Sequence, residues 1–188
     1  MRRKDREMSK DFGLMVIDKA QYGVLNLPEG ASAYGVPLSI ARVDETLYFH
    51  SAKEGKKCDL MVDGQGVHVV FVGDVQVPSV LDPDQVDVNA ETLTTGEFGK
   101  IFSKTFTTEF ESAMVLGVIR KVTEDAEKIK GLRAISEKFT PQWMSYFDYA
   151  VASGLKVTAV YAIDILEVTA KRKKYDASGQ EMKWGREV

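Results

Sequence analysis

The sequence predicts a mainly β protein of the α+β class, in which about six antiparallel strands close wholly or partly into a barrel with helices packed outside. Strand-like segments follow one another through short turns, so hairpins rather than βαβ units should join most of them. The segment 67–72 is strongly β-forming and lies between Gly66 and Gly73. The segment 156–170 is rich in Val, Ala and Ile, as expected of a buried barrel strand.

The first half of the chain combines helical and strand periodicity. The predicted elements are a helix at 11–22, strands at 24–27, 34–42 and 46–50, and a short helix at 51–61. Gly23 ends the first helix, and Pro28 and Gly30 mark the turn after the first strand. The turn at 44–45 makes a hairpin of the second and third strands. Pro37 has no N–H for a ladder hydrogen bond, so it should lie at a sheet edge, at a bulge or against a ligand.

The second half contains one weakly patterned stretch among strongly patterned ones. The predicted elements are the strand at 67–72, a long excursion at 74–100, a strand at 106–122, a helix beginning after Thr123, a helical stretch at 141–152, the strand at 156–170 and a polar C-terminal arm from about 171. Gly117 should bend the long strand. A chain of 188 residues fits a single domain, 1–188.

Composition excludes several classes of protein. The formal net charge of −3 and the pI near 5.5 argue against a general nucleic-acid binder. Cys58 is the only cysteine, which excludes an intramolecular disulfide and a cysteine-based zinc site and fits a reducing compartment. No stretch approaches the roughly 20 apolar residues of a membrane span, and no apolar run follows the charged N-terminus. We therefore expect a cytoplasmic protein that binds neither membranes nor nucleic acids.

The most informative segment, Leu47–Lys57, leads from a predicted strand into a predicted helix with two adjacent lysines. Ser51 offers a hydroxyl, the helix start offers amides, and Lys56 and Lys57 offer fixed positive charge. This combination suits a phosphate group. The alternative is an ordinary solvated helix start that is rich in lysine.

Other features have a functional and a structural interpretation. Around Gly35 and Pro37 the backbone could approach a flat ligand closely, although an ordinary edge strand has the same pattern. We interpret His50 as a ligand contact, His68 as a core or barrel-lining residue and Cys58 as a packed helix residue. We expect the aromatic residues to fill a core or a subunit interface; they are Trp143, Tyr146, Phe147 and Tyr149. The basic cluster Lys171–Lys174 is interpreted as a solvated strand end.

Three of these segments together resemble a known superfamily. They are Tyr34–Leu38, Leu47–Lys57 and Phe106–Gly117, and the charged start Met1–Glu7 adds to them. The chain resembles the FMN-binding split β-barrel proteins, and more narrowly the nitroimidazole-resistance proteins related to pyridoxamine 5′-phosphate oxidase. The resemblance implies an antiparallel split β-barrel and a homodimer with FMN at the subunit interface. Compared with that family, the segment at about 74–104 looks like an insertion that could cover the flavin.

The resemblance also implies which residues bind the cofactor. They are Val36, Pro37, Leu38, Ser39, His50, Ser51, Ala52, Lys56 and Lys57, with Thr107 and Thr108 reaching the cofactor from the partner subunit. His50 is the candidate catalytic proton donor, because it titrates near neutral pH. Hydride would pass from NAD(P)H to the flavin and then to a small-molecule acceptor such as a nitro group. The alternatives are a flavin-binding protein without catalysis, and a related split barrel that binds haem or FAD.

Overall fold

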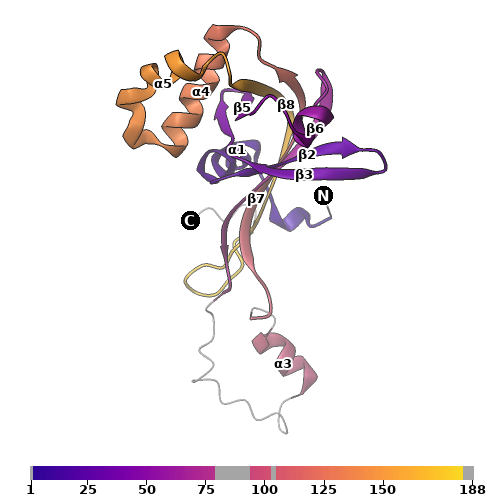
Figure 1. Ribbon diagram of the computed structural model, residues 1–188. Coiled ribbons are helices and arrows are strands. Elements are labelled where there is room, and N and C mark those ends of the chain that lie inside the picture. The colour runs from indigo at the N-terminus through magenta and orange to yellow at the C-terminus, as the bar shows by residue number, and fades with distance from the viewer. Residues whose placement is uncertain (1, 79–93, 103–104, 184–188) are drawn as a thin grey trace.

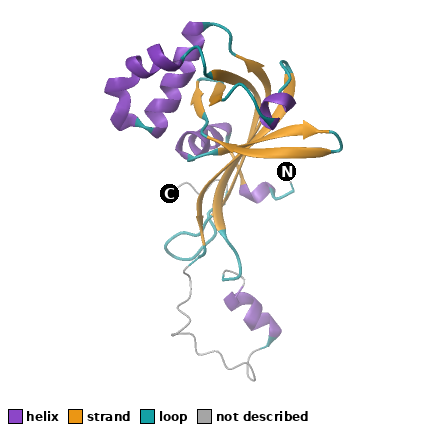
Figure 2. Ribbon diagram, viewed as in Figure 1, coloured by secondary structure: helices purple, strands orange, loops and turns teal. Residues whose placement is uncertain are grey.

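A single antiparallel sheet organises the computed structural model, which describes residues 2–78, 94–102 and 105–183 (Figures 1 and 2). The strands are β1 Glu7–Met8, β2 Gly23–Glu29, β3 Ser32–Leu38, β4 Ala41–Val43, β5 Thr46–Ser51, β6 Gln65–Gln76, β7 Glu109–Lys121 and β8 Ala159–Lys173. Their order is β3-β2-β6-β7-β8-β5-β4, and β1 pairs with β8. Because β3 and β4 are the two ends of this order, the barrel is split rather than closed. The predicted fold class is confirmed, with eight strands instead of about six.

Most of the helices lie around this sheet, whereas the one at Thr95–Phe102 lies apart from it (Figure 1). They are α1 Lys10–Lys19, α2 Lys56–Leu60, α3 Thr95–Phe102, α4 Asp125–Phe139 and α5 Phe147–Gly154, with 3₁₀ turns η1 Lys4–Arg6 and η2 Pro141–Tyr146. The side chain of Ser9 caps α1 by accepting a hydrogen bond from the Phe12 N–H at 3.1 Å. Gly13 lets α1 approach the sheet closely, since an added Cβ there would lie 2.6 Å from Val168. Its Val16 and Ile17 are fully buried.

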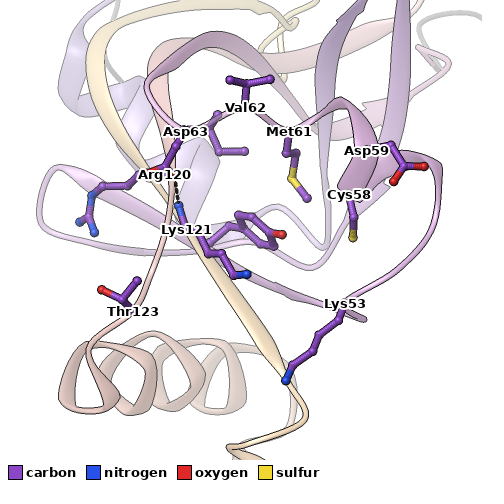
Figure 3. Close-up of a pocket in the computed structure, with 11 residues that line it drawn as sticks. Lys53, Cys58, Asp59, Met61, Val62, Asp63, Arg120, Lys121 and Thr123 are labelled. Carbon is purple, nitrogen blue, oxygen red and sulfur yellow. Dashed lines mark hydrogen bonds between the residues drawn. The ribbon is translucent and has the colours of Figure 1, made fainter.

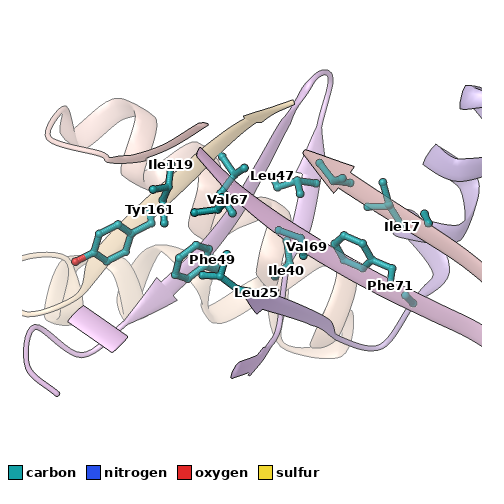
Figure 4. Packing of buried hydrophobic residues seen from close by; sticks show 14 of the residues in the cluster. Ile17, Leu25, Ile40, Leu47, Phe49, Val67, Val69, Phe71, Ile119 and Tyr161 are labelled. Atoms are coloured by element: carbon teal, nitrogen blue, oxygen red, sulfur yellow. The ribbon is translucent and has the colours of Figure 1, made fainter. Parts of the chain in front are cut away.

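The main core lies between α1 and the curved sheet (Figure 4). Its largest fully buried side chains include Phe49, Phe71, Leu25, Leu27, Leu47 and Ile40. Phe49 stacks on Tyr161 with ring centroids 5.4 Å apart. A smaller cluster joins α4 to β5 through Tyr48, Val160 and Ile135. These buried residues alternate with outward-facing ones along each strand, and the strand predictions depended on this alternation.

An ion-pair network fixes α4 to the sheet. Arg120 on β7 contacts Glu127 on α4 at 2.7 Å and Asp164 on β8 at 2.8 Å. Tyr48 donates its hydroxyl hydrogen to Glu127 at 3.0 Å. Burial of the ring, and then the nearby Glu127, raise the pKa of Tyr48 to about 12. The start of α4 is therefore held by side chains from three strands.

Two predicted element boundaries are wrong. The strand predicted at 34–42 breaks at Ser39–Ile40, because β3 pairs with β2 whereas β4 pairs with β5. Apolar residues alternate across this break, so the sequence pattern does not show it. The helix predicted at 51–61 begins only at Lys56: Ser51 still belongs to β5, and Gly55 with φ of 110° reverses the chain before the helix.

Most of the other predicted elements are confirmed, and part of the predicted insertion cannot be compared with the structure. The first helix and the strands at 24–27, 46–50, 67–72 and 106–122 are confirmed within a few residues, although β6 is considerably longer than predicted. Residues 79–93 and 103–104 of the predicted insertion lie outside the described residues. At the C-terminus β8 continues to Lys173, and Tyr175 then pairs with Glu181, which forms an ion pair with Arg6.

The predicted bend at Gly117 coincides with a register shift. On β8, Glu167 lies opposite Leu116 and Ile165 lies opposite Gly117, so Leu166 is the extra residue of a bulge. An added Cβ at position 117 would lie 2.6 Å from Ile163 Cγ2 and 2.7 Å from the Asp164 carbonyl oxygen. Glycine is thus required here for close approach of two strands.

Gly117→Ala should therefore destabilise the fold by about 1–3 kcal/mol, because strand β8 must shift to admit the methyl group. Gly66→Ala is the matched control on β6, where nothing lies within 4 Å of an added Cβ. Urea denaturation of both variants measures the difference. Equal free energies of unfolding would contradict this account of the bulge.

Candidate functional site

The structure brings the two main sequence-predicted segments, β3 and 50–57, to one region of the barrel. Lys56 on α2 forms an ion pair with Glu29 at 2.7 Å, and its ammonium lies 4.8 Å from the centroid of the Tyr34 ring. Glu29 and Tyr34 flank the β2–β3 turn. The helix with the paired lysines thus lies against the hairpin that carries the predicted ring-binding strand.

The edge strand β3 presents its residues in two directions. Val36 and Leu38 are partly buried and pack against the main core. Pro37 and Gly35 are exposed on the opposite face, and Ser39 is exposed in the break after β3. Since β3 is an edge strand, the prediction that Pro37 lies at a sheet edge is confirmed. A ligand on this strand would therefore meet backbone and Pro37 rather than the Val36 and Leu38 side chains.

The two lysines differ in their surroundings. Lys56 is exposed, and the hydrogen bond to Glu29 raises its pKa. Lys57 is half-buried and has no hydrogen bond or ion pair with any described residue. Because α2 has only five residues, its dipole is small, and most positive charge in the region comes from the lysines. An anion would therefore find one unpaired ammonium and a second that must leave Glu29.

His50 and Ser51 end β5 beside this helix. Ser51 is buried, with its Oγ 3.6 Å from Cys58 Sγ, whereas His50 and Ala52 are exposed. Partial desolvation of the imidazole, and then the positive charge of Lys57, lower the pKa of His50. At neutral pH the ring is consequently uncharged, with one nitrogen able to donate a hydrogen bond and the other to accept.

Thr107 and Thr108 do not join this region within one chain. They precede β7, and Lys173 donates a hydrogen bond to the Thr107 hydroxyl. His50 lies beside Val160, near the other end of the β7–β8 ladder. At about 3.3 Å per residue, the length of β7 puts the two ends roughly 40 Å apart.

Several structural interpretations need correction. His68 lies exposed on the outer face of the sheet rather than in the core. Of the four aromatic residues, Phe147 is buried, whereas Trp143, Tyr146 and Tyr149 are at least 60% exposed and do not fill a core; their place in a subunit interface stays a prediction. Arg172 is only 8% exposed, so the basic cluster is not simply a solvated strand end. Its side chain faces α1, with the guanidinium 5.5 Å from the Phe12 ring centroid. Cys58 is half-buried, and its thiol donates to the Ala52 carbonyl at 3.2 Å, in agreement with a packed residue.

Sequence reasoning missed a cavity of about 420 Å³ at the end of the barrel (Figure 3). It is lined by Lys53, Cys58, Asp59, Met61, Val62, Asp63, Ile119, Arg120, Lys121, Thr123 and Tyr161. These residues come from α2 with its flanking loops and from the ends of β7 and β8, which are far apart in the sequence. No local motif could have shown their proximity. In the described part of the chain, no group of His, Cys, Asp and Glu is suited to hold a metal ion.

The split barrel, with its paired lysines beside an edge strand, defines a class of fold, and comparison with known proteins identifies the family. A profile of the pyridoxamine 5′-phosphate oxidase family matches residues 13–172. The chain belongs to this family, which confirms the resemblance inferred from the sequence. No curated protein sequence matches. None of the described helices has the length and apolar character needed to cross a membrane.

Solved structures with the same fold have low sequence identity. A candidate 5-nitroimidazole antibiotic-resistance protein from Bacteroides thetaiotaomicron has a TM-score of 0.63 and 20% identity, over 88% of this chain and 86% of its own. The flavocytochrome Anf3 from Azotobacter vinelandii has a TM-score of 0.64 and 14% identity, over 96% and 79%. The FAD and heme binding protein from Mycobacterium smegmatis has a TM-score of 0.67 and 16% identity, over 93% and 77%.

Titration of His50 tests the electrostatics of this region. NMR of the imidazole should place its pKa below the ordinary value of 6.5, and Lys57→Gln should raise it. Because the folded chain binds this proton more weakly than the unfolded chain, His50 destabilises the fold as pH falls from 6.5 through the folded pKa. Lys56→Gln is the control, since Glu29 already balances that charge. The same His50 pKa in the wild type and in Lys57→Gln would contradict the assignment.

Proposed function

We propose that this protein binds FMN and acts as an oxidoreductase on a small-molecule acceptor. The observation that carries the proposal is the Lys57 ammonium, which is unpaired among the described residues and lies beside Lys56, Ser51 and the edge strand β3. Membership of the pyridoxamine 5′-phosphate oxidase family supports it. So do structural neighbours that are named as a flavocytochrome and as an FAD and heme binding protein.

The residues of the region fit an FMN molecule. Lys57 and Lys56 would bind the phosphate, with Lys56 exchanging Glu29 for it. The backbone from Val36 to Ser39 would lie along the ring, with Pro37 facing it, and Ala52 and the Ser51 backbone would border the ribityl chain. A bound flavin would supply the redox chemistry, accepting hydride from NAD(P)H and passing electrons to the acceptor. The protein itself would orient the flavin and shield it from water.

We assign His50 the role of proton donor to the acceptor. Only the imidazolium form can transfer a proton. The lowered pKa of His50 leaves this form in the minority at pH 7, so this role predicts that turnover rises as pH falls toward the folded pKa. His50→Gln keeps a hydrogen-bond donor but cannot take part in proton transfer. A role in proton transfer predicts slower turnover at unchanged FMN affinity, whereas a contact role predicts weaker FMN binding.

We also propose a homodimer formed through the outer face of the sheet. On this face Val72 and Met114 are 45% and 41% exposed, while α1 covers the opposite face. Leu116 and His68 border a depression of about 210 Å³ on the same surface. Antiparallel pairing of two copies there would bring Thr107 and Thr108 of one copy toward the cofactor of the other. The single cysteine accords with a cytoplasmic location.

Two other functions have support. A flavin carrier without catalysis would have the same binding region, and steady-state oxidation of NAD(P)H separates it from an enzyme. Haem binding is suggested by the named neighbours and by exposed His50 and His68. The absorption spectrum of the purified protein separates flavin bands from a Soret band, and mass spectrometry of the released ligand separates FMN from FAD.

Removing the phosphate contacts should weaken FMN binding. Lys57→Gln should raise the FMN dissociation constant about 10- to 100-fold, because a charge-assisted hydrogen bond contributes roughly 1.5–3 kcal/mol. Lys56→Gln should cost less, since that lysine already has Glu29 as partner. Lys130→Gln, on the exposed surface of α4, is the charge-matched control. Unchanged affinity in a variant lacking both Lys56 and Lys57 would rule out the phosphate assignment.

The dimer has its own test. Met114→Glu should convert a dimer into a monomer in light scattering, because two carboxylates would be buried between the sheets. Val157→Glu, at a residue that is 69% exposed in the turn before β8, should leave the dimer intact. A monomeric wild-type protein would contradict the proposed assembly.

A further inference from the structure

The cavity near Tyr161 adjoins the candidate cofactor region, because Cys58 in its wall contacts Ser51 and Ala52. None of the predicted cofactor-binding residues lines it. Lys56 extends from α2 toward Glu29 on the β2–β3 hairpin, whereas Cys58 and Asp59, further along the same short helix, border the cavity. The opposite wall is the end of β7, at 119–121. A ligand here would therefore contact Cys58 and Asp59 of α2 rather than Lys56.

Part of the cavity wall is rigid and apolar. Ile119 and Tyr161 are 1% and 8% exposed and belong to the main core. Met61 packs partly buried against the same core, and Val62 is 60% exposed at the margin. Burial of the ring, and then the neighbouring Cys58 thiol, raise the pKa of Tyr161, so its hydroxyl stays protonated. This wall offers an apolar surface with one fixed hydroxyl.

The positive charge of Lys121 is uncompensated. Its backbone N–H donates to Asp63 Oδ1 at 2.6 Å, which fixes the start of the side chain. Its ammonium has no hydrogen bond or ion pair with any residue that the structure describes. Lys53 donates to the Lys156 carbonyl at 2.7 Å and has no acidic partner among those residues.

The other charges at the cavity are balanced or directed elsewhere. Arg120 is neutralised by Glu127 and Asp164, which do not line the cavity. In Figure 3 the Asp59 carboxylate points away from Lys121 and Lys53, and Asp63 is occupied by its bond to the Lys121 backbone. Both carboxylates would still repel a ligand with two negative charges. Since Asp59 and Asp63 offset part of the positive charge of Lys121 and Lys53, the cavity suits an anion of low charge.

We propose that this cavity is a second ligand site, which binds a small organic monocarboxylate with an apolar body. The carboxylate would contact the Lys121 ammonium, with Lys53 and Thr123 at the entrance, and the apolar body would lie against Ile119, Met61 and the Tyr161 ring. A volume of about 420 Å³ lies within the usual range for small-molecule sites. This site goes beyond the proposed flavin chemistry and does not depend on it.

Thermal unfolding of the protein as purified tests the proposal. The probes are benzoate, indole-3-acetate and octanoate, each with its neutral amide as a matched control. At least one carboxylate, at about ten times its Kd, should raise Tm by roughly 3–5 °C, and its amide should not. Lys121→Gln should abolish this shift because it removes the ammonium while leaving the backbone bond to Asp63. Lys130→Gln should preserve the shift.

Cys58 provides a second readout, because it is the only cysteine and lines the cavity. A bound carboxylate should slow its alkylation by iodoacetamide, in which the thiolate displaces iodide, and the mass of the intact chain measures the rate. The proposal is overturned if none of the carboxylates exceeds its amide in both readouts, or if Lys121→Gln retains the effect. A carboxylate effect that is lost in Lys57→Gln but kept in Lys121→Gln would instead locate the anion at the candidate cofactor region.

Discussion

The arrangement of the sheet depends on how the chain is held where it crosses between β3 and β4. Ile40, in this crossing, is fully buried, and its carbonyl accepts a hydrogen bond from Lys138 Nζ at 2.9 Å. The same ammonium donates to the Ile17 carbonyl, also at 2.9 Å. Burial lowers the pKa of Lys138 to about 8, which measures the cost of desolvating the charge. One α4 side chain therefore joins the end of α1 to the split in the barrel.

Charged groups hold the helices in comparable ways at the two ends of the β7–β8 ladder. At one end Arg120 joins α4 to the sheet. At the other end Asp74 and the buried Glu111 bind Lys19, from the end of α1. Hydrogen bonds from lysines hold the pKa of Asp74 well below its usual range. Arg172 lies near this second network with its Nε and Nη2 atoms unpaired among the described residues, and the Phe12 ring contacts its guanidinium.

Local patterns predicted the strands well and their partners poorly. Val67, Val69 and Phe71 alternate with outward residues as a half-buried strand requires, and β6 forms there. The same alternation continues from Val36 to Ile40, yet the chain breaks there into two strands. The first, β3, pairs with β2, and the second, β4, pairs with β5. Likewise the sequence showed that Lys56 and Lys57 are adjacent, but it did not show that Lys56 forms an ion pair with Glu29. Pairing partners and ion pairs depend on residues distant in sequence, which periodicity does not report.

The sequence by itself determined the class of fold and the family, and it indicated the segment 50–57 as a candidate anion site, because strand alternation, turn residues and a contiguous lysine pair are local properties. Only the tertiary structure decided that Lys56 pairs with Glu29 while Lys57 has no partner in the described part of the chain. It also decided that Thr107 lies at the far end of the ladder, and that Lys121 and Tyr161 border a cavity beside α2. The physical reason is that burial, pKa shifts and charge balance depend on residues that are close in space. In a split barrel these residues come from segments far apart in the sequence.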